Sequence, residues 1–177
     1  MVHLTPAMQK FVLHWGEMGD KWGINRSVAQ VYALLYVAAK PLDAEAIAET
    51  LSMARSNVST SIRELQSWGI IRLVHKVGDR RDHYEAFADP WETLDRVLEE
   101  RRKREIDPTI RVLGECIAEA KSNTKEDKQV AQRLEALRDL LVQGDAFCAA
   151  VRKLPRETLL KAARAGGKLK ELLTSRS

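Results

Sequence analysis

The sequence predicts a mainly α-helical protein with one small β-hairpin, and two neighbouring stretches carry this prediction. In residues 51–69, apolar side chains recur at the spacing of the buried side of an amphipathic helix: Val58, Ile62 and Leu65. In residues 70–87, two runs rich in β-branched and aromatic side chains flank a polar turn over 78–82, which is the pattern of a hairpin. The fold class is therefore helical with a small sheet.

The order of the elements around these stretches makes the prediction more specific. Residues 43–51 are expected to form a short helix with Asp43 as its N-cap, and Gly69 is expected to end the next helix in the left-handed conformation. Two such helices form a helix-turn-helix, and a hairpin directly after them makes a winged helix with the hairpin as its wing. We expect this domain to cover residues 1–88 and a C-terminal helical region to cover residues 89–177.

The polar side of the 51–69 helix carries small hydrogen-bonding groups between arginines: Arg55, Ser56, Asn57, Ser59, Thr60 and Arg63. Small polar side chains let a helix approach base edges closely, and arginines bind phosphates, so this side suits the major groove of DNA. The turn of the hairpin adds Arg80 and Arg81. The solvated side of an ordinary amphipathic helix has a similar composition, but the wing beside it favours DNA binding.

Residues 25–91 resemble the MarR superfamily of bacterial and archaeal regulators and, within it, the GbsR-type branch. The resemblance is carried by three segments, which are residues 25–36, 54–69 and 78–85. It covers the DNA-binding half densely and the C-terminal half only as a pattern of helices. It implies a winged-helix protein that regulates transcription by binding DNA.

Two details of the resemblance concern single residues. Asp79-Arg80-Arg81 fits the Asp-x-Arg signature of the superfamily's wing, in which the acid orients the second arginine, here Arg81, towards DNA. Ala54 departs from the pattern, because similar proteins usually have Ser or Thr at the position that caps the recognition helix. Since alanine accepts no hydrogen bond, the cap must come from Ser52 or be lost, at a cost of ~1 kcal/mol.

Composition narrows the class of protein further. The chain has 177 residues and is 45% hydrophobic and 31% charged, which suits one compact domain or two small ones. No apolar run approaches the ~18 residues of a transmembrane helix, and the N-terminus lacks the apolar region of a signal peptide. Cys116 and Cys148 lie far apart without a motif, which suits a reducing cytoplasm. Together with the missing apolar run, this predicts a cytoplasmic protein with no membrane partner. The net charge of +4 is too small to indicate a nucleic-acid partner by itself.

Start signals and apolar stripes predict the remaining helices over residues 6–18, 25–37, 89–122, 124–151 and 156–173. Three glycines are expected to loosen the region that follows the first helix: Gly16, Gly19 and Gly23. Asp107-Pro108 is expected to restart or kink the 89–122 helix.

The 124–151 helix carries an apolar seam with a period of 3.5 residues: Val130, Leu134, Leu137, Leu141, Gly144, Cys148 and Val151. We expect this seam to pack on other helices, with those of a partner subunit among them. A homodimer with two-fold symmetry would match a palindromic operator.

The sequence offers little for catalysis, and we expect neither an enzyme nor a cofactor. It contains no Gly-rich phosphate loop, nucleophile elbow or HExxH motif. His75 and His83 are placed to face each other across the hairpin, but two histidines there leave metal ligands missing. Cross-strand pairing or phosphate contact is the preferred interpretation for them. Cys148 is expected to be a buried thiol in the helix seam rather than a redox sensor.

Aromatic residues are numerous in the predicted DNA-binding half, and four of them suggest an effector pocket: Trp15, Trp22, Tyr32 and Trp91. GbsR-type relatives are associated with choline, and aromatic faces hold quaternary ammonium groups through cation–π attraction. Packing in the core and at interfaces is the alternative role for these rings.

The function that this sequence predicts is a homodimeric, ligand-responsive transcriptional repressor that binds double-stranded DNA at a palindromic operator. The alternative is a winged helix that contacts proteins or RNA without reading a DNA sequence. The Asp79-x-Arg81 pattern beside a Ser/Asn/Thr face favours the first function, because a protein-binding wing has no need of it.

Overall fold

The computed structural model describes residues 2–121 and 125–174 of the chain. The chain divides into two compact units, Met1–Glu100 and Arg101–Ser177, which are considered separately below. The sequence places the boundary earlier, between residues 88 and 89. The difference arises because the helix that follows the wing packs on the first unit, where Thr93 accepts a hydrogen bond from buried Tyr32 at 3.3 Å.

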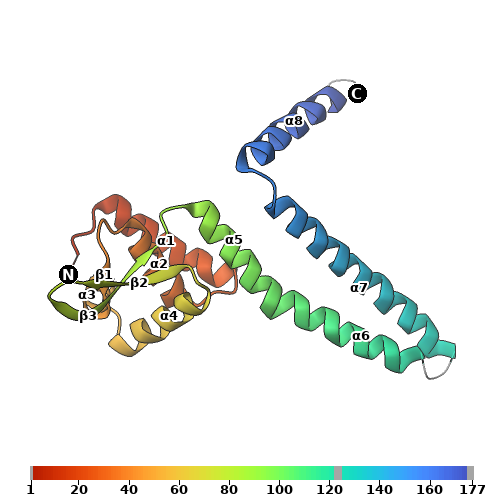
Figure 1. The fold of residues 1–177 in the computed structure, drawn as a ribbon, viewed down its shortest axis with the longest axis horizontal. Coiled ribbons are helices and arrows are strands. Elements are labelled where there is room, and N and C mark those ends of the chain that lie inside the picture. Colours follow the sequence, from red (N-terminus) through yellow and green to blue (C-terminus); the bar gives the residue numbers. More distant parts are fainter. Residues whose placement is uncertain (1, 122–124, 175–177) are drawn as a thin grey trace. The chain divides into compact units, whose positions relative to one another are not determined.

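The first unit combines helices with a small antiparallel sheet, as Figure 1 shows. Its elements are α1 (Pro6–Lys21), α2 (Arg26–Val37), β1 (Leu42–Asp43), α3 (Ala44–Leu51), α4 (Arg55–Ser67), β2 (Ile71–Lys76), β3 (Asp79–Ala86) and α5 (Pro90–Arg101). The strand order is β1-β3-β2. This arrangement confirms the mainly helical fold with a winged helix-turn-helix, in which α3 and α4 form the helix-turn-helix and the β2–β3 hairpin forms the wing.

Helix α2 lies at the centre of the hydrophobic core, as its nearly continuous apolar sequence indicates. Val31, Ala33 and Leu34 are fully buried on it. The predicted stripe of α4 packs against the same core, with all three of its members buried: Val58, Ile62 and Leu65. Burial of this stripe fixes which side of α4 faces solvent.

The glycines of α1 hold helices together, which corrects the expectation that they loosen the chain. α1 runs through Gly16 and Gly19 to Lys21, and both glycines are buried. A Cβ on Gly16 would lie 2.5 Å from Cγ of Gln30, and a Cβ on Gly19 would lie 2.5 Å from Cβ of Ala29. The missing side chains therefore let α1 approach α2 closely.

The sheet differs from the predicted hairpin in two ways. Its turn is only Val77–Gly78, and Gly78 has a φ of 82°, so residues 79–82 belong to strand β3 and not to the turn. The short strand β1 was not expected, and it pairs Leu42 with Tyr84.

The histidines of the hairpin do not face each other, which corrects the prediction from sequence. The register pairs Val74 with His83, and side chains alternate between the two faces of a strand. His83 is therefore buried, whereas His75 is exposed. Among the described residues, no group of three or more metal-ligating side chains gathers at one place.

The second unit contains a π-helical turn, η1 (Arg102–Ile106), followed by α6 (Asp107–Lys121), α7 (Lys125–Arg152) and α8 (Arg156–Thr174). The π-turn ends two residues before Pro108, and the N–H of Asp107 bonds to the carbonyl of Arg102, five residues back. Because proline lacks an N–H and crowds the preceding turn, the helix widens there instead of breaking. The expected kink at Asp107-Pro108 thus takes the form of a π-bulge.

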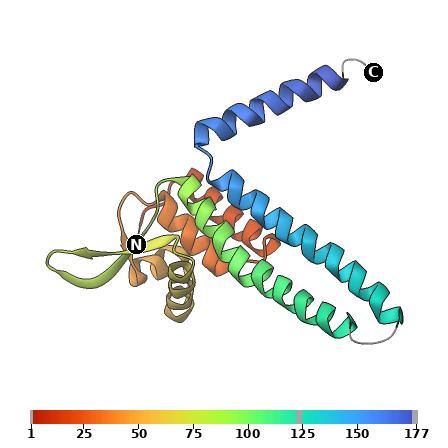
Figure 2. The ribbon, with the colours of Figure 1, turned by 45° about the vertical axis from the view of Figure 1, so that its right-hand side comes forward.

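Helices α6 and α7 pack side by side as an antiparallel pair, as Figure 2 shows. Only part of the predicted seam of α7 is covered: Leu134 and Leu141 are half-buried, while Val130, Leu137, Gly144 and Cys148 are exposed. Ala131, which is buried, is not in the seam. α7 also exposes large apolar side chains in a single chain: Val130, Leu137, Leu140, Val142 and Phe147. Cys148 is exposed, which corrects the expectation of a buried thiol. Thr124, the predicted start of this helix, lies outside the described residues.

Within the described ranges, no helix has both the length and the apolar character needed to cross a membrane.

Candidate nucleic-acid interface

The solvent side of α4 presents all six side chains that the sequence selects for DNA contact. Each of them is exposed: Arg55, Ser56, Asn57, Ser59, Thr60 and Arg63. The guanidinium of Arg63 donates to Oγ1 of Thr60 at 3.3 Å, one turn away on the same side. Burial of the opposite stripe therefore leaves one continuous polar and cationic surface, which we name the reading face.

The first turn of α4 has no side-chain cap. Ala54 occupies the N-cap position with extended backbone angles, and no side chain accepts from the first turn. Ser52 cannot take over, because it ends α3 in the left-handed conformation with a φ of 52°. Of the two outcomes that the sequence allows, the cap is lost.

In the wing, Asp79 forks onto Arg81. Its carboxylate accepts from Nε at 3.0 Å and from Nη2 at 2.7 Å, and its Oδ1 also accepts the backbone N–H of Arg81 at 3.0 Å. These hydrogen bonds and the neighbouring positive charge hold the pKa of Asp79 well below its ordinary value and raise the pKa of Arg81. The Asp-x-Arg pair thus has the geometry that the resemblance implies, and the direction of Arg81 towards DNA stays a prediction. Arg80 is exposed on the same strand.

A second acid binds Arg81, and sequence reasoning missed it. Oδ2 of Asp43 lies 2.7 Å from Nη1 of Arg81, while Oδ1 of Asp43 caps α3 by accepting the N–H of Ala46 at 2.8 Å. The N-cap role was predicted from local sequence. The contact with Arg81 depends on strand β1, which pairs Asp43 with His83 and so brings it close to a residue far away in the chain.

His83 fills the space beside these charged groups. Its Nε2 lies 3.6 Å from Oδ2 of Asp79 and 3.9 Å from Oδ2 of Asp43, and the side chain is only 5% exposed. Its Nδ1 lies 2.9 Å from the carbonyl oxygen of Arg81. The buried imidazole therefore shields one side of the carboxylates from water and is not placed to contact phosphate.

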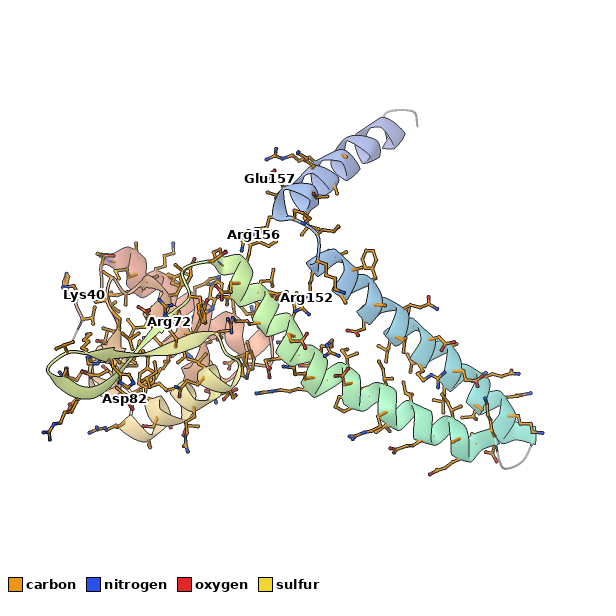
Figure 3. The ribbon with its side chains drawn as sticks, in the orientation of Figure 1. Lys40, Arg72, Asp82, Arg152, Arg156 and Glu157 are labelled. Atoms are coloured by element: carbon orange, nitrogen blue, oxygen red, sulfur yellow. The ribbon has the colours of Figure 1, made fainter. Side chains whose placement is uncertain are left out.

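The base of the hairpin makes a further set of contacts that the sequence does not reveal. Arg72 pairs with Glu85 across β2 and β3, with Nε 2.6 Å from the carboxylate, and Figure 3 shows Arg72 on the hairpin. The guanidinium of Arg96 on α5 lies 4.5 Å from the ring centroid of Phe87, at the end of the wing. A Cβ on Gly69 would lie 3.1 Å from Nη1 of Arg96, so glycine there also gives this guanidinium room beside the end of α4.

The aromatic residues form a row over α1 and α2. Trp22 meets Trp15 edge-on at 5.4 Å, Trp15 and Tyr36 both meet Phe11, and Tyr36 stacks on Tyr32 at 6.0 Å. Trp15 and Trp22 are thus neighbours, as the predicted effector pocket requires. Tyr32 is buried and donates to Thr93, and burial raises the pKa of its hydroxyl. Trp91 is exposed on α5, so an effector pocket made by all four predicted residues stays a prediction.

A polar, cationic reading face beside a wing is the arrangement with which winged helix-turn-helix proteins bind DNA. Comparison with known proteins finds a family match over part of the chain. Residues 22–82 match the model of the MarR family. This match over part of the chain confirms the resemblance to the MarR family that the sequence carries.

Two relatives come from Bacillus subtilis (strain 168). The chain is 26% identical over 91 residues to YvaV, which is classed as an HTH-type transcriptional regulator, and the match covers 51% of each protein. It is 25% identical over 134 residues to the HTH-type transcriptional repressor GbsR, with 74% of each protein covered. The chain thus spans only about half the length of the first of these relatives.

A solved structure shares the fold. It is the crystal structure of a transcriptional regulator, which superposes with a TM-score of 0.57 at 23% identity and covers 83% of this chain and 96% of that one.

Proposed function

We propose that this protein binds double-stranded DNA in a sequence-specific way as a homodimer and represses transcription. The observation that carries the proposal is the reading face of α4, whose six polar and cationic side chains are all exposed beside the wing. Four of the six are short, so α4 can enter a major groove closely, and the arginines can neutralise phosphates on either side. The similarity to GbsR, which is a transcriptional repressor, supports repression rather than activation, since the match covers 74% of that protein.

Asn57 is the residue of the reading face best suited to read a base, because an asparagine amide can both donate to and accept from adenine. It lies in the first turn of α4, the part of a recognition helix that enters the groove. We expect Asn57→Ala to weaken binding to a duplex selected from a random pool by ~1–3 kcal/mol and to change binding to a scrambled duplex little.

Gln66→Ala is the matched control for this experiment. Gln66 is an exposed amide on the same helix. It lies nine residues after Asn57, so the two side chains point about 180° apart around the helix axis. The control should bind both duplexes as the wild type does. Equal losses on the selected and the scrambled duplex in Asn57→Ala would contradict base reading. A wild type that prefers no duplex in the pool would favour the alternative, a winged helix that binds proteins or RNA.

The homodimer is supported by apolar surface that a single chain leaves exposed in each unit. The exposed members are Trp91, Leu94 and Leu98 on α5, and Val130, Leu137, Leu140 and Phe147 on α7. Burial of such surface is the main favourable contribution to subunit association. Sedimentation at micromolar concentration should show one species at twice 20.0 kDa.

Phe147→Asp tests whether the exposed apolar side chains of α7 take part in the dimer. Phe147 is 70% exposed in the single chain, so its replacement should leave the fold intact and shift the protein towards monomer. Val77→Asp adds the same charge at an exposed apolar residue in the turn of the wing and should sediment as the wild type does. A wild-type monomer would contradict both the dimer and the palindromic operator.

The response to an effector is supported by the contact between Trp15 and Trp22. Quaternary ammonium groups bind to such indole faces. Titration with choline should quench or shift the tryptophan fluorescence and change the affinity for the selected duplex, and Trp15→Leu should remove both effects. Fluorescence and affinity that choline leaves unchanged would contradict choline as the effector.

A further inference from the structure

One carboxylate, that of Asp43, binds two separate parts of the winged helix. Its Oδ1 holds the first turn of α3 through Ala46, and its Oδ2 holds Arg81 of the wing. The side chain of Asp43 is only 10% exposed, so water competes little for either oxygen. A single acid therefore connects the first helix of the helix-turn-helix with the wing.

The contacts of Arg81 show how the wing is held. Its Nε and Nη2 donate to Asp79, which belongs to the same strand, and its Nη1 reaches Asp43, which belongs to a different strand. The guanidinium of Arg81 and the two carboxylates that bind it carry a net charge of −1 together. Arg81 is thus a weak source of positive charge for DNA and a strong tie between two elements.

The backbone alone connects these elements sparsely. Strand β1 consists of Leu42 and Asp43 only, so few hydrogen bonds join it to β3. The hairpin also extends beyond the helices of its own unit, as Figure 2 shows. A small rotation at this short strand pair therefore moves the tip of the hairpin by a large distance. A side-chain tie at Asp43 therefore has a large effect on the orientation of the wing.

We propose that Asp43 is a positioning residue for DNA recognition: through Arg81 it fixes the wing against the helix-turn-helix, so that α4 and the wing meet DNA as one preformed surface. This inference rests on the proposed function, since it concerns how DNA is bound. A wing that is fixed before binding loses less conformational freedom on docking, and the affinity for DNA rises accordingly. Asp43 itself needs no contact with DNA in this role.

Asp43→Asn separates the two tasks of this side chain. Asparagine caps a helix as well as aspartate does, so α3 keeps its first turn. The variant removes the negative charge that Arg81 binds. The amide NH2 group that takes the place of Oδ2 is a hydrogen-bond donor, and a guanidinium cannot accept from it because it has only donors itself. Arg81→Gln breaks the same ion pair by changing its exposed partner. It keeps the test valid if Asp43→Asn folds poorly.

Asp82→Asn is the matched control. Asp82 is an exposed acid on β3, the strand that carries Arg81, and Figure 3 labels it on the hairpin. Both Asp→Asn variants raise the net charge by one, so charge alone would tighten DNA binding similarly in both. If Asp43 positions the wing, Asp43→Asn weakens binding to the selected duplex about tenfold, and Asp82→Asn leaves it unchanged or tightens it up to about threefold. Adding Arg81→Gln to Asp43→Asn should then cost no more than about twofold, because both changes break one interaction.

Hydrogen exchange in the free protein gives a measurement that does not depend on DNA. We expect the amides of β1 and β3 to exchange about tenfold faster in Asp43→Asn than in the wild type, with those of α3 unchanged because the cap is kept. Asp82→Asn should exchange as the wild type does. Faster exchange together with weaker binding supports the inference, whereas unchanged exchange, or binding that tightens as in Asp82→Asn, overturns it.

The two measurements also separate this inference from the proposed function. A wild type that binds no duplex overturns the proposed function, and hydrogen exchange then decides alone whether Asp43 holds the wing. A wild type that binds DNA with an affinity that Asp43→Asn leaves intact overturns only the positioning role.

Discussion

The uncapped start of the recognition helix gives a direct prediction about stability. Ala54 stands at the N-cap of α4 with φ −61° and ψ 138°, and its carbonyl accepts the first intrahelical bond, from the N–H of Val58 at 3.2 Å. The N–H groups of the three residues between them have no partner within the helix. A hydroxyl at residue 54 would accept from one of these groups, so Ala54→Thr should stabilise the first unit.

The expected gain is about 1 kcal/mol in the free energy of unfolding, the usual value of a Thr or Ser cap relative to alanine. Ala54 is exposed, so a branched side chain has room there without displacing the core. For a cooperative unit the size of Met1–Glu100, this gain corresponds to a rise of about 4–8 °C in the melting temperature.

Thermal unfolding followed by tryptophan fluorescence measures the stability of the first unit, where residue 54 lies. All four tryptophans of the chain lie in the first unit: Trp15, Trp22, Trp68 and Trp91. Ala54→Val is the control, because valine has the shape of threonine and no hydroxyl. Equal melting temperatures for the Thr and Val variants would refute the reasoning, since the hydrogen bond would then contribute nothing.

Two further predictions concern the packing of α1 and the charge pair of the wing. Gly16→Ala should destabilise the protein by about 1–3 kcal/mol in urea unfolding, because its Cβ would lie 2.5 Å from Cγ of Gln30. Gly114→Ala is the control: a Cβ there has nothing within 4 Å, so this change should stabilise the protein by up to about 1 kcal/mol. Similar effects of the two changes would contradict close packing at Gly16. The pKa of Asp79 is lowered by Arg81, so the stabilisation from this pair is fully present above the ordinary aspartate pKa of about 3.9 and is lost as the pH falls towards the folded value. NMR titration should show the Asp79 pKa return towards 3.9 in Arg81→Gln, and an unchanged pKa in that variant would exclude Arg81 as the cause.

Much of the fold could be predicted from the sequence because its signals are local. The buried stripe of α4, the left-handed Gly69 and the N-cap Asp43 each depend on a few neighbouring residues, and the structure shows all three where they were expected. The reading face follows from the same periodicity, since burial of one side of a helix exposes the other. For the α4 cap the sequence left two outcomes, a cap from Ser52 or none, and the structure shows that the cap is lost.

The tertiary structure decided which residues meet across the chain. Nothing near Asp43 indicates strand β1, because two residues are too few to show a strand pattern, and the contact between Asp43 and Arg81 depends on that strand. The register likewise decided that His83 is buried, and the close approach of α1 to α2 turned Gly16 from a loosening residue into a packing site. A sequence pattern reports the period of one element, whereas pairing between elements is set by contacts that are distant in the chain, so the tie between wing and helix-turn-helix became visible only in three dimensions.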